Sequence, residues 1–267
     1  MVGGGLKIAV CGKGGVGKTL IAGTLARLLA RRGFKVLAID VDSNPNLHMT
    51  LGVGAGVTLK PVTSDENLVE ERTGAKLGGW GVFFSLTPRV DDIPDKFSII
   101  GPDGVRLLAV GMPSAGAGCL CPQNALIKAL IDHAILERGE VIVMDMEAGL
   151  EHFGRATARG VDVLLVIIEP TYKSLETARR SSNYARELGI KNVWGVLNKV
   201  MNERDAEEFS RRAEEMGVEV KAIIPFDVNV VEAEKLGVSI IDYKEDTAFT
   251  RSLEKLCDVI GGGITRG

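Results

Sequence analysis

Short runs of β-branched and aliphatic residues alternate along the chain with longer amphipathic segments. The runs are nearly continuous in Val, Ile and Leu, which is typical of parallel strands covered on both faces. They occupy residues 7–11, 35–40, 105–110, 141–145, 161–168, 193–198 and 219–224. This alternation predicts an α/β fold, with a mostly parallel, twisted sheet flanked by helices on both faces.

The amphipathic segments between these runs predict helices. A glycine follows each of them as a stop signal, because glycine readily adopts the left-handed conformation that ends a helix. The predicted helices are residues 19–32, 123–137, 174–188 and 203–216, followed by Gly33, Gly139, Gly189 and Gly217. An apolar segment around Cys257 predicts a further helix near the C-terminal end.

Residues 54–104 break the alternation, since they hold many glycines and prolines and few periodic signals. We expect an irregular insertion of loops and short elements there, with one helix over residues 68–77. No other stretch is rich enough in Gly and Pro to mark a flexible linker. The chain has 267 residues and can bury a substantial core, so we expect one domain over residues 1–267.

Charge and hydropathy narrow the classes of partner. The formal net charge of −3 argues against broad electrostatic attraction to nucleic acid or to anionic lipid. The N-terminal residues hold no apolar stretch of signal-peptide length, and apolar runs such as residues 163–168 are too short to span a bilayer. We therefore expect a cytoplasmic protein that binds neither nucleic acid nor membrane.

Residues 12–19, Gly-Lys-Gly-Gly-Val-Gly-Lys-Thr, satisfy the phosphate-loop pattern G-x-x-x-x-G-K-[ST] between a predicted strand and a predicted helix. The glycines let backbone N–H groups turn around a phosphate at the helix N-terminus. Lys18 should reach the β- and γ-phosphates, and the Thr19 hydroxyl should bind Mg²⁺. The predicted nucleotide contacts are Gly12, Lys13, Gly14, Gly15, Val16, Gly17, Lys18, Thr19 and Leu20.

A second lysine, Lys13, directly follows the first glycine. The string Lys-Gly-Gly-Val-Gly-Lys-Thr at 13–19 resembles the deviant Walker A ATPases, which include MinD, ParA, the nitrogenase iron protein and Mrp-type iron–sulfur carriers. That resemblance implies a MinD-like fold and slow ATP hydrolysis by a homodimer, in which Lys13 reaches the partner's nucleotide. A cation there would neutralise charge that develops on the transferring phosphoryl group. From spacing alone, a solvated surface lysine is an equal alternative.

Two acidic loops follow predicted strands, at the sheet edge where doubly wound folds bind ligands. In Asp-Val-Asp-Ser-Asn-Pro at 40–45, the resemblance assigns to Asp42 the orientation of the attacking water. In Asp-Met-Glu-Ala-Gly at 145–149, it places Asp145 near Mg²⁺. Glu147 stands where many relatives carry proline, so this loop is expected to behave differently here.

The ends of the last two predicted strands supply candidates for the nucleotide base. Asn198 and Lys199 end one strand, and Pro225 follows the other. By resemblance, Asn198 contacts the adenine edge and residues near Pro225 form the other wall. Asn and Pro also end strands for purely structural reasons.

Cys119 and Cys121 lie in a glycine-rich loop, and Pro122 marks the start of the next helix. A helix N-terminus favours the thiolate, the form that binds soft metals. Two thiolates are too few for a closed site, but a two-fold dimer would bring four together. The alternative is a pair of small buried hydrophobic residues, which is how we interpret Cys11 and Cys257.

The string Gly-Ala-Gly-Cys-Leu-Cys-Pro at 116–122, together with residues 145–155, resembles the CooC family of carbon monoxide dehydrogenase maturation ATPases and the related acetyl-CoA synthase maturation factors. The resemblance covers essentially the whole chain. It implies a metallochaperone that uses ATP and ADP with Mg²⁺, binds Ni²⁺ or Zn²⁺ at Cys119 and Cys121 across the dimer, and delivers nickel to a client enzyme. Glu151, His152 and Arg155 could relay the nucleotide state to the metal loop or contact the client enzyme. His152 could also be a metal ligand, but a lone histidine is more often a hydrogen-bonded structural residue, which is the expectation for His48, His133 and His152.

Two other functions remain open from the sequence. A MinD- or ParA-like nucleotide switch would need a basic amphipathic terminal helix or a basic DNA-binding face, and the chain supplies neither. An iron–sulfur carrier would space its cysteines differently, because Mrp-type proteins use a C-x-x-C pair. The sequence does not distinguish Ni²⁺ from Zn²⁺ and does not name the client enzyme.

Overall fold

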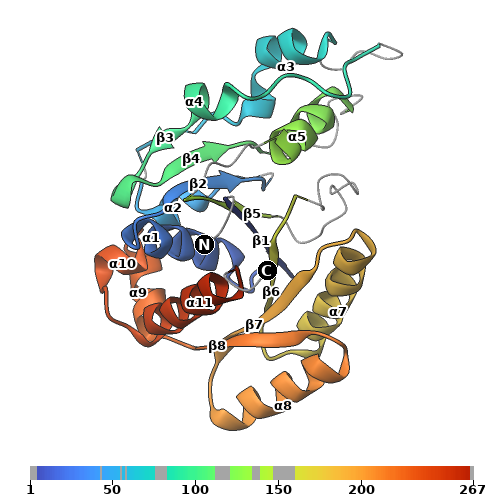
Figure 1. The fold of residues 1–267 in the computed structure, drawn as a ribbon. Helices are drawn as coiled ribbons and strands as arrows, with labels where there is room; N and C mark the ends of the chain where they lie inside the picture. The colour runs from blue at the N-terminus through green and yellow to red at the C-terminus, as the bar shows by residue number, and fades with distance from the viewer. Residues whose placement is uncertain are drawn as a thin grey trace.

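The computed structural model describes residues 5–42, 44–54, 56–57, 59–75, 83–111, 121–133, 139–146 and 160–264, with backbone alone at 132–133 and 262–264. Within these ranges, strands run through the middle of the molecule and helices pack on both sides of them (Figure 1). The strands are β1 (Leu6–Gly12), β2 (Lys35–Asp40), β3 (Ile99–Ile100), β4 (Arg106–Ala109), β5 (Glu140–Asp145), β6 (Val163–Ile168), β7 (Asn192–Val200) and β8 (Glu219–Pro225).

These strands form one sheet in the order β3-β4-β2-β5-β1-β6-β7-β8. Every neighbouring pair is parallel except β3 and β4, which pair antiparallel. The parallel register places Gly12 beside Ile167 and Asp40 beside Asp145. Parallel strands end at a common edge, so the loops that follow β1, β2, β5 and β6 are brought together there.

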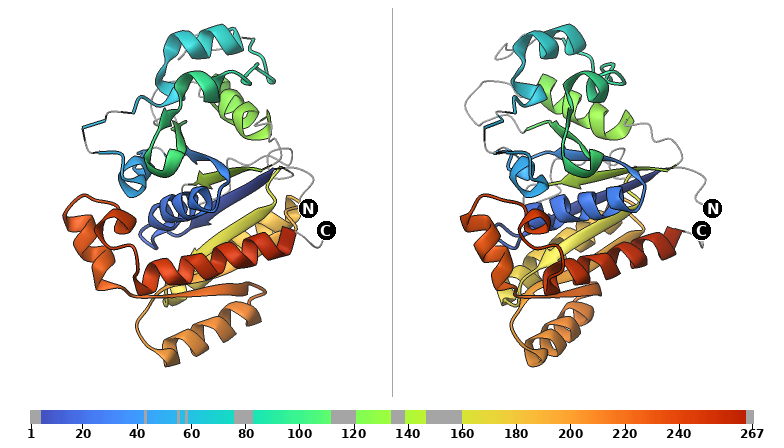
Figure 2. Two further views of the ribbon diagram at one scale, coloured as in Figure 1. Left: turned by 60° about the vertical axis from the view of Figure 1, so that its left-hand side comes forward. Right: turned by 90° about the vertical axis from the view of Figure 1, so that its left-hand side faces the viewer.

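Each face of the sheet buries its own hydrophobic cluster. Figure 2 shows, from two further directions, the helices that cover the two faces. One face carries α1 (Lys18–Arg31), α2 (Leu47–Leu51), α9 (Val228–Lys235), α10 (Ile240–Tyr243) and α11 (Ala248–Ile264). The other carries α3 (Glu66–Thr73), α4 (Ile93–Phe97), α5 (Cys121–His133), α7 (Tyr172–Glu187) and α8 (Glu203–Glu215). None of the described helices is long and apolar enough to cross a membrane.

The α/β class, the mostly parallel sheet and the seven predicted strands are confirmed. The glycines predicted to stop helices all have positive φ, at 90° for Gly33, 86° for Gly139, 92° for Gly189 and 78° for Gly217. The helix predicted at 68–77 instead covers Glu66–Thr73, because Asp65 caps its start and Gly74, at φ 78°, ends it.

The insertion predicted at 54–104 is more ordered than its composition indicates. Beside α3 and α4 it contains two short 3₁₀ helices, η1 (Val62–Ser64) and η2 (Pro102–Gly104), and the edge strand β3. A strand as short as β3 leaves no periodic signal in the sequence, since only its pairing with β4 defines it.

A buried arginine holds several segments around α1. The Arg27 side chain is 2% exposed, and two of its guanidinium nitrogens donate to the Asp242 carboxylate at 2.7 and 2.8 Å. Its Nε donates to Asp103 at 2.6 Å. Gly52 lies so close that a Cβ there would meet Asp242 Oδ2 at 2.4 Å. The charged network therefore fixes α10 and η2 against the helix that follows the phosphate loop.

Candidate functional site

The phosphate loop leaves β1 at Gly12 and enters α1 at Lys18, as predicted. Gly12 has φ 145°, and a Cβ at this position would lie 2.5 Å from the Ile167 carbonyl oxygen on β6. Gly15 and Gly17 have φ 81° and 98°. No side chain caps α1 at Gly17, so the loop presents an uncapped helix N-terminus, which suits a phosphate.

The two lysines of this loop lie in different surroundings. Lys18 is 9% exposed, and its Nζ donates to the Lys13 carbonyl oxygen at 3.4 Å, across the loop. Lys13 extends to the adjoining strand end instead, where its Nζ is 3.2 Å from Glu169 Oε1. Lys18 is therefore already inside the loop, whereas Lys13 is paired outside it.

Three carboxylates converge beside the loop. Asp40 and Asp145 are register partners at the ends of β2 and β5, and both are buried. Asp40 accepts hydrogen bonds from the backbone N–H of Asp42 at 3.1 Å and of Leu47 at 2.9 Å, which ties the loop after β2 to the start of α2. Asp42 in turn accepts from the N–H of Asn44 at 2.9 Å.

Burial raises the pKa of both strand-end carboxyls. The pKa of Asp145 rises to about 7 because the group is desolvated, although a hydrogen bond with Thr19 opposes the change and the Asp40 charge adds to it. The pKa of Asp40 rises to about 6, again mainly through desolvation. Asp145 Oδ1 is buried with no hydrogen-bond partner among the described residues.

This donor set fits a hard divalent cation. The buried Asp145 oxygen, which finds no partner in the described part of the chain, lies in the same cluster as the Thr19 hydroxyl and the Asp42 carboxylate. Magnesium ions prefer oxygen ligands and usually bind one or two carboxylates together with substrate phosphates. The sequence prediction of Thr19 and Asp145 beside a magnesium ion is thus compatible with the geometry.

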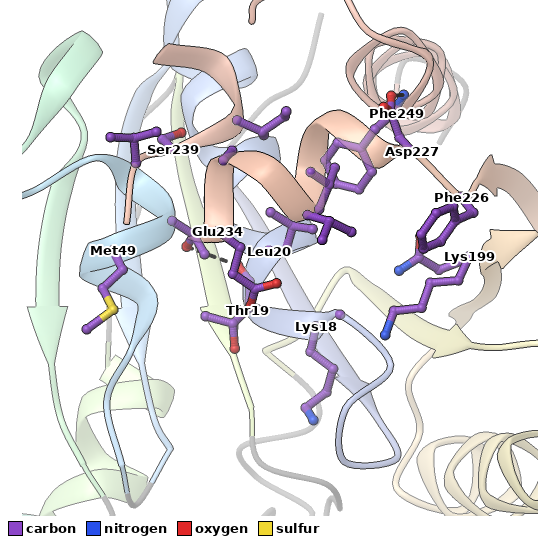
Figure 3. Close-up of a pocket in the computed structure, with 18 of the residues that line it drawn as sticks. Lys18, Thr19, Leu20, Met49, Lys199, Phe226, Asp227, Glu234, Ser239 and Phe249 are labelled. Carbon is purple, nitrogen blue, oxygen red and sulfur yellow. Dashed lines mark hydrogen bonds between the residues drawn. The ribbon is translucent and has the colours of Figure 1, made fainter. Parts of the chain in front are cut away.

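A cavity of about 570 Å³ opens from the phosphate loop toward the C-terminal part of the chain. Figure 3 shows Lys18 and Lys199 on the loop side and Met49 of α2 across from them, with Glu234 and Ser239 from the α9–α10 segment. The far wall is held by Asp227, which caps α9 and also accepts from the Phe249 N–H at 3.1 Å. A cavity of this size and position can hold a nucleoside.

The residues predicted for the base, Asn198, Lys199 and Pro225, all line this cavity. Asn198 is 2% exposed and its Nδ2 donates to the Val16 carbonyl oxygen at 2.8 Å. Lys199 adopts φ 59°, and its Nζ donates to the Gly15 carbonyl oxygen at 2.7 Å. Both side chains therefore brace the phosphate loop from the end of β7, a role that the sequence did not indicate.

Among the candidate metal ligands, Cys121 begins α5 and is exposed. Cys119 lies outside the described residues, as do Glu147, Glu151, His152 and Arg155. Among the described residues, no three His, Cys, Asp or Glu side chains are arranged to hold a metal ion on their own. The predicted cysteine site of two chains is untested.

The other cysteines are buried, as expected for packing residues, and burial raises the pKa of Cys257 to about 12. His48 is buried too, but the expectation that it is hydrogen-bonded is not met at Nδ1, which has no partner among the described residues. Burial lowers its pKa. His133 is described in its backbone alone.

Sequence reasoning missed several residues of this site. Asp40 had a usable signal, since it ends a strand two residues before Asp42. Glu169 had none, because it contacts Lys13 across 156 positions of sequence. Met49 lines the cavity as an exposed apolar side chain and belongs to no motif, whereas Phe226 falls within the wall predicted near Pro225.

Residues 7–240 match the family model described as the CobQ/CobB/MinD/ParA nucleotide binding domain. An uncharacterized ATP-binding protein of Methanocaldococcus jannaschii is 44% identical over 257 residues, covering 96% of this chain and 97% of the relative. The carbon monoxide dehydrogenase accessory protein CooC of Rhodospirillum rubrum is 43% identical over 240 residues, covering 89% and 90% of the two chains. These matches confirm both resemblances inferred from the sequence.

Solved structures agree on the fold. The septum site-determining protein MinD of Pyrococcus horikoshii, in complex with Mg-ADP, superposes with a TM-score of 0.66 at 20% identity, covering 96% of each chain. The MinD cell division protein of Aquifex aeolicus gives 0.66 at 19% identity, covering 96% and 97%. At such identities the likeness establishes the fold alone.

Proposed function

Because the chain belongs to the CobQ/CobB/MinD/ParA family of nucleotide-binding proteins, we propose that it is a cytoplasmic ATPase that works as a homodimer and delivers nickel to a client enzyme. The observation that carries the ATPase part is the buried carboxylate oxygen of Asp145, which has no hydrogen-bond partner among the described residues and lies beside a complete phosphate loop. A buried acidic oxygen without a partner is costly unless a cation completes it.

In this proposal the loop binds the triphosphate and the strand-end oxygens hold Mg²⁺. The N-terminus of α1 and the Lys18 ammonium would neutralise the β- and γ-phosphates. Thr19 and Asp145 would hold the magnesium ion, which supplies charge neutralisation between the two phosphates. Asn198 and Lys199 would keep the loop in shape, since each donates to a loop carbonyl.

Asp42 is proposed to orient the attacking water. It sits on the loop after β2, and Asp40 anchors that loop through two backbone hydrogen bonds. Lys13 is proposed to act on the nucleotide of the partner chain, where an added cation would stabilise charge that develops at the transferred phosphoryl group. Adenine is proposed to lie in the cavity between Asn198 and Pro225.

The metal-delivery part is supported by the 43% identity to the Rhodospirillum rubrum accessory protein and by the position of Cys121 at the exposed start of α5. Cys119 and Cys121 of two chains would bind one Ni²⁺ or Zn²⁺ as cargo. A metal held by both chains favours the dimer, and ATP that also favours the dimer must then strengthen metal binding reciprocally. The proposed client is carbon monoxide dehydrogenase or acetyl-CoA synthase.

Metal analysis of anaerobically purified protein tests this part. Offered Ni²⁺ or Zn²⁺, the wild type should hold about one metal per dimer, and nucleotide should change that value. The Cys119→Ala/Cys121→Ala variant should lose the metal, whereas Cys257→Ser, at a buried packing position, should keep it. Metal content that is equal in wild type and double variant, in every nucleotide state, would exclude the cysteine site and leave an ATPase with another role.

A further inference from the structure

Glu169 lies at the same sheet edge as the phosphate loop and is built into a rigid turn. It directly follows β6, its backbone N–H donates to the Ser174 hydroxyl at 3.0 Å, and its carbonyl oxygen accepts from the Thr171 N–H at 2.6 Å. Thr171 caps α7 by accepting from the Ser174 N–H. The turn therefore fixes the point from which the Glu169 side chain extends.

The phosphate loop is fixed against the same strand. Gly12 pairs with Ile167 in the sheet, and its backbone approaches β6 too closely for any side chain. Lys13 and Glu169 thus leave neighbouring strands at nearly the same height, and the 3.2 Å contact between them joins two well-anchored backbones. Such an ion pair loses less backbone entropy on forming than one between two flexible loops.

The Lys13–Glu169 ion pair is partly buried. The side chains of Lys13 and Glu169 are 38% and 21% exposed, and each is the other's sole ion-pair partner in the part of the chain that the structure describes. Besides Lys13, the Glu169 carboxylate has one further contact there, with the Thr171 hydroxyl at 3.4 Å. A carboxylate at the rim of a phosphate site also opposes the approach of a triphosphate, since like charges repel in a partly desolvated place.

We propose that Glu169 is a positioning residue for Lys13: it holds the lysine away from the nucleotide in the single chain and competes for it with the triphosphate of ATP. The inference rests on the proposed function, in which Lys13 acts on bound nucleotide. ATP must break the Lys13–Glu169 ion pair before Lys13 can contact a phosphate. The strength of this pair therefore sets the ATP concentration at which two chains associate. A nucleotide without a γ-phosphate carries less negative charge, so it displaces Glu169 from Lys13 less readily.

The test is the ATP concentration that half-saturates dimer formation, measured by sedimentation with Mg²⁺ present. Glu169→Gln keeps the shape of the side chain but removes its charge, and it should lower this midpoint about 5- to 30-fold. Glu176→Gln is the matched control, because Glu176 lies on α7, shortly after the Glu169 turn, and its ion pairs in the described part of the chain are with the surface residues Arg179 and Arg180, so its midpoint should equal that of the wild type. Glu169→Asp should shift the midpoint in the same direction by a smaller factor.

The dependence on Lys13 separates this role from a general charge effect. In the double variant Lys13→Gln/Glu169→Gln, most of the decrease in the ATP midpoint should be lost, and the midpoint should be close to that of Lys13→Gln alone. An unchanged or raised midpoint in Glu169→Gln, with thermal unfolding like that of the wild type, overturns the proposal. If the wild type does not associate with ATP at all, the proposed function fails. The proposed role of Glu169 is then tested by the affinity of the single chain for a fluorescent ATP analogue. Equal affinity in Glu169→Gln and the wild type would exclude that role.

Discussion

Replacing Lys18 by alanine is expected to lower ATP hydrolysis by about 10²- to 10³-fold and to weaken nucleotide binding strongly. The Lys18 ammonium is the buried cation of the phosphate loop, 9% exposed, and its Nζ already lies 3.4 Å from the loop's own carbonyl oxygen at Lys13. A preorganised cation in a partly desolvated site stabilises the charge that develops in a transition state by several kcal/mol, and a 10²- to 10³-fold effect corresponds to about 3–4 kcal/mol.

Steady-state hydrolysis and titration with a fluorescent ATP analogue give the two readouts. Lys255→Ala provides the control, since Lys255 is exposed on α11 far from the loop in sequence and carries the same charge. ATP hydrolysis and binding of the analogue should both be unchanged in Lys255→Ala. Hydrolysis by Lys18→Ala within a factor of three of the wild type would contradict the assignment of residues 12–19 as the phosphate site.

Replacing Asp145 by asparagine is expected to have opposite effects on activity and on the stability of the nucleotide-free protein. The Asp145 pKa is about 7 in the folded chain against an ordinary value of 3.8, because the carboxyl is desolvated. The folded state therefore retains a proton that the unfolded state has lost. Below the unfolded value this contribution to stability is fully present, and it declines as the pH rises through about 4 to 7.

At pH 8 and without divalent metal, the wild type carries this carboxylate buried and charged, whereas asparagine is neutral. The variant should then be more stable to urea by about 2 kcal/mol, below the roughly 4 kcal/mol upper bound that the pKa change gives. At pH 5 the difference should fall to less than half of this, because the unfolded carboxyl is already ionised there while the folded one is still protonated. In the presence of Mg-ATP the wild type should be the more stable of the two to urea. Hydrolysis by the variant should fall at least about 100-fold.

Urea unfolding at pH 5 and pH 8 in the presence of a chelator measures the stability difference. Asp258→Asn is a suitable comparison, because Asp258 forms a solvent-exposed pair with Arg32 and should change stability by less than about 1 kcal/mol at either pH. An Asp145→Asn variant that is less stable than the wild type at pH 8 would show that the carboxylate is favourably paired in the empty site. The magnesium assignment would then lose its main support.

The sequence predicts those features whose physics is local. The phosphate loop is complete within residues 12–19, and its strand and helix follow from the apolar run before it and the periodicity after it. The helix stops at Gly33 and Gly189 could be predicted for the same reason, since a positive φ is a property of one residue. Asp145 could be placed at the sheet edge because it ends an unbroken apolar strand.

Features made by long-range packing could not be predicted. The cavity wall from α9 and α10 reaches the phosphate loop only because the β8 edge and the Arg27–Asp242 contact bring it there. Lys199 contacts Gly15 across 184 positions, and no pattern in either segment indicates the pair. Glu169 follows a strand like many other acidic residues, so its place beside Lys13 depends on the β1–β6 register.

If ATP is hydrolysed by a pair of chains, the specific ATPase activity must depend on the concentration of the chain. At saturating Mg-ATP we expect activity per chain to be low in dilute solution and to rise with concentration to a plateau, in step with the dimer fraction from sedimentation. Activity per chain that stays constant while the protein sediments as a single chain would show that one chain hydrolyses ATP alone.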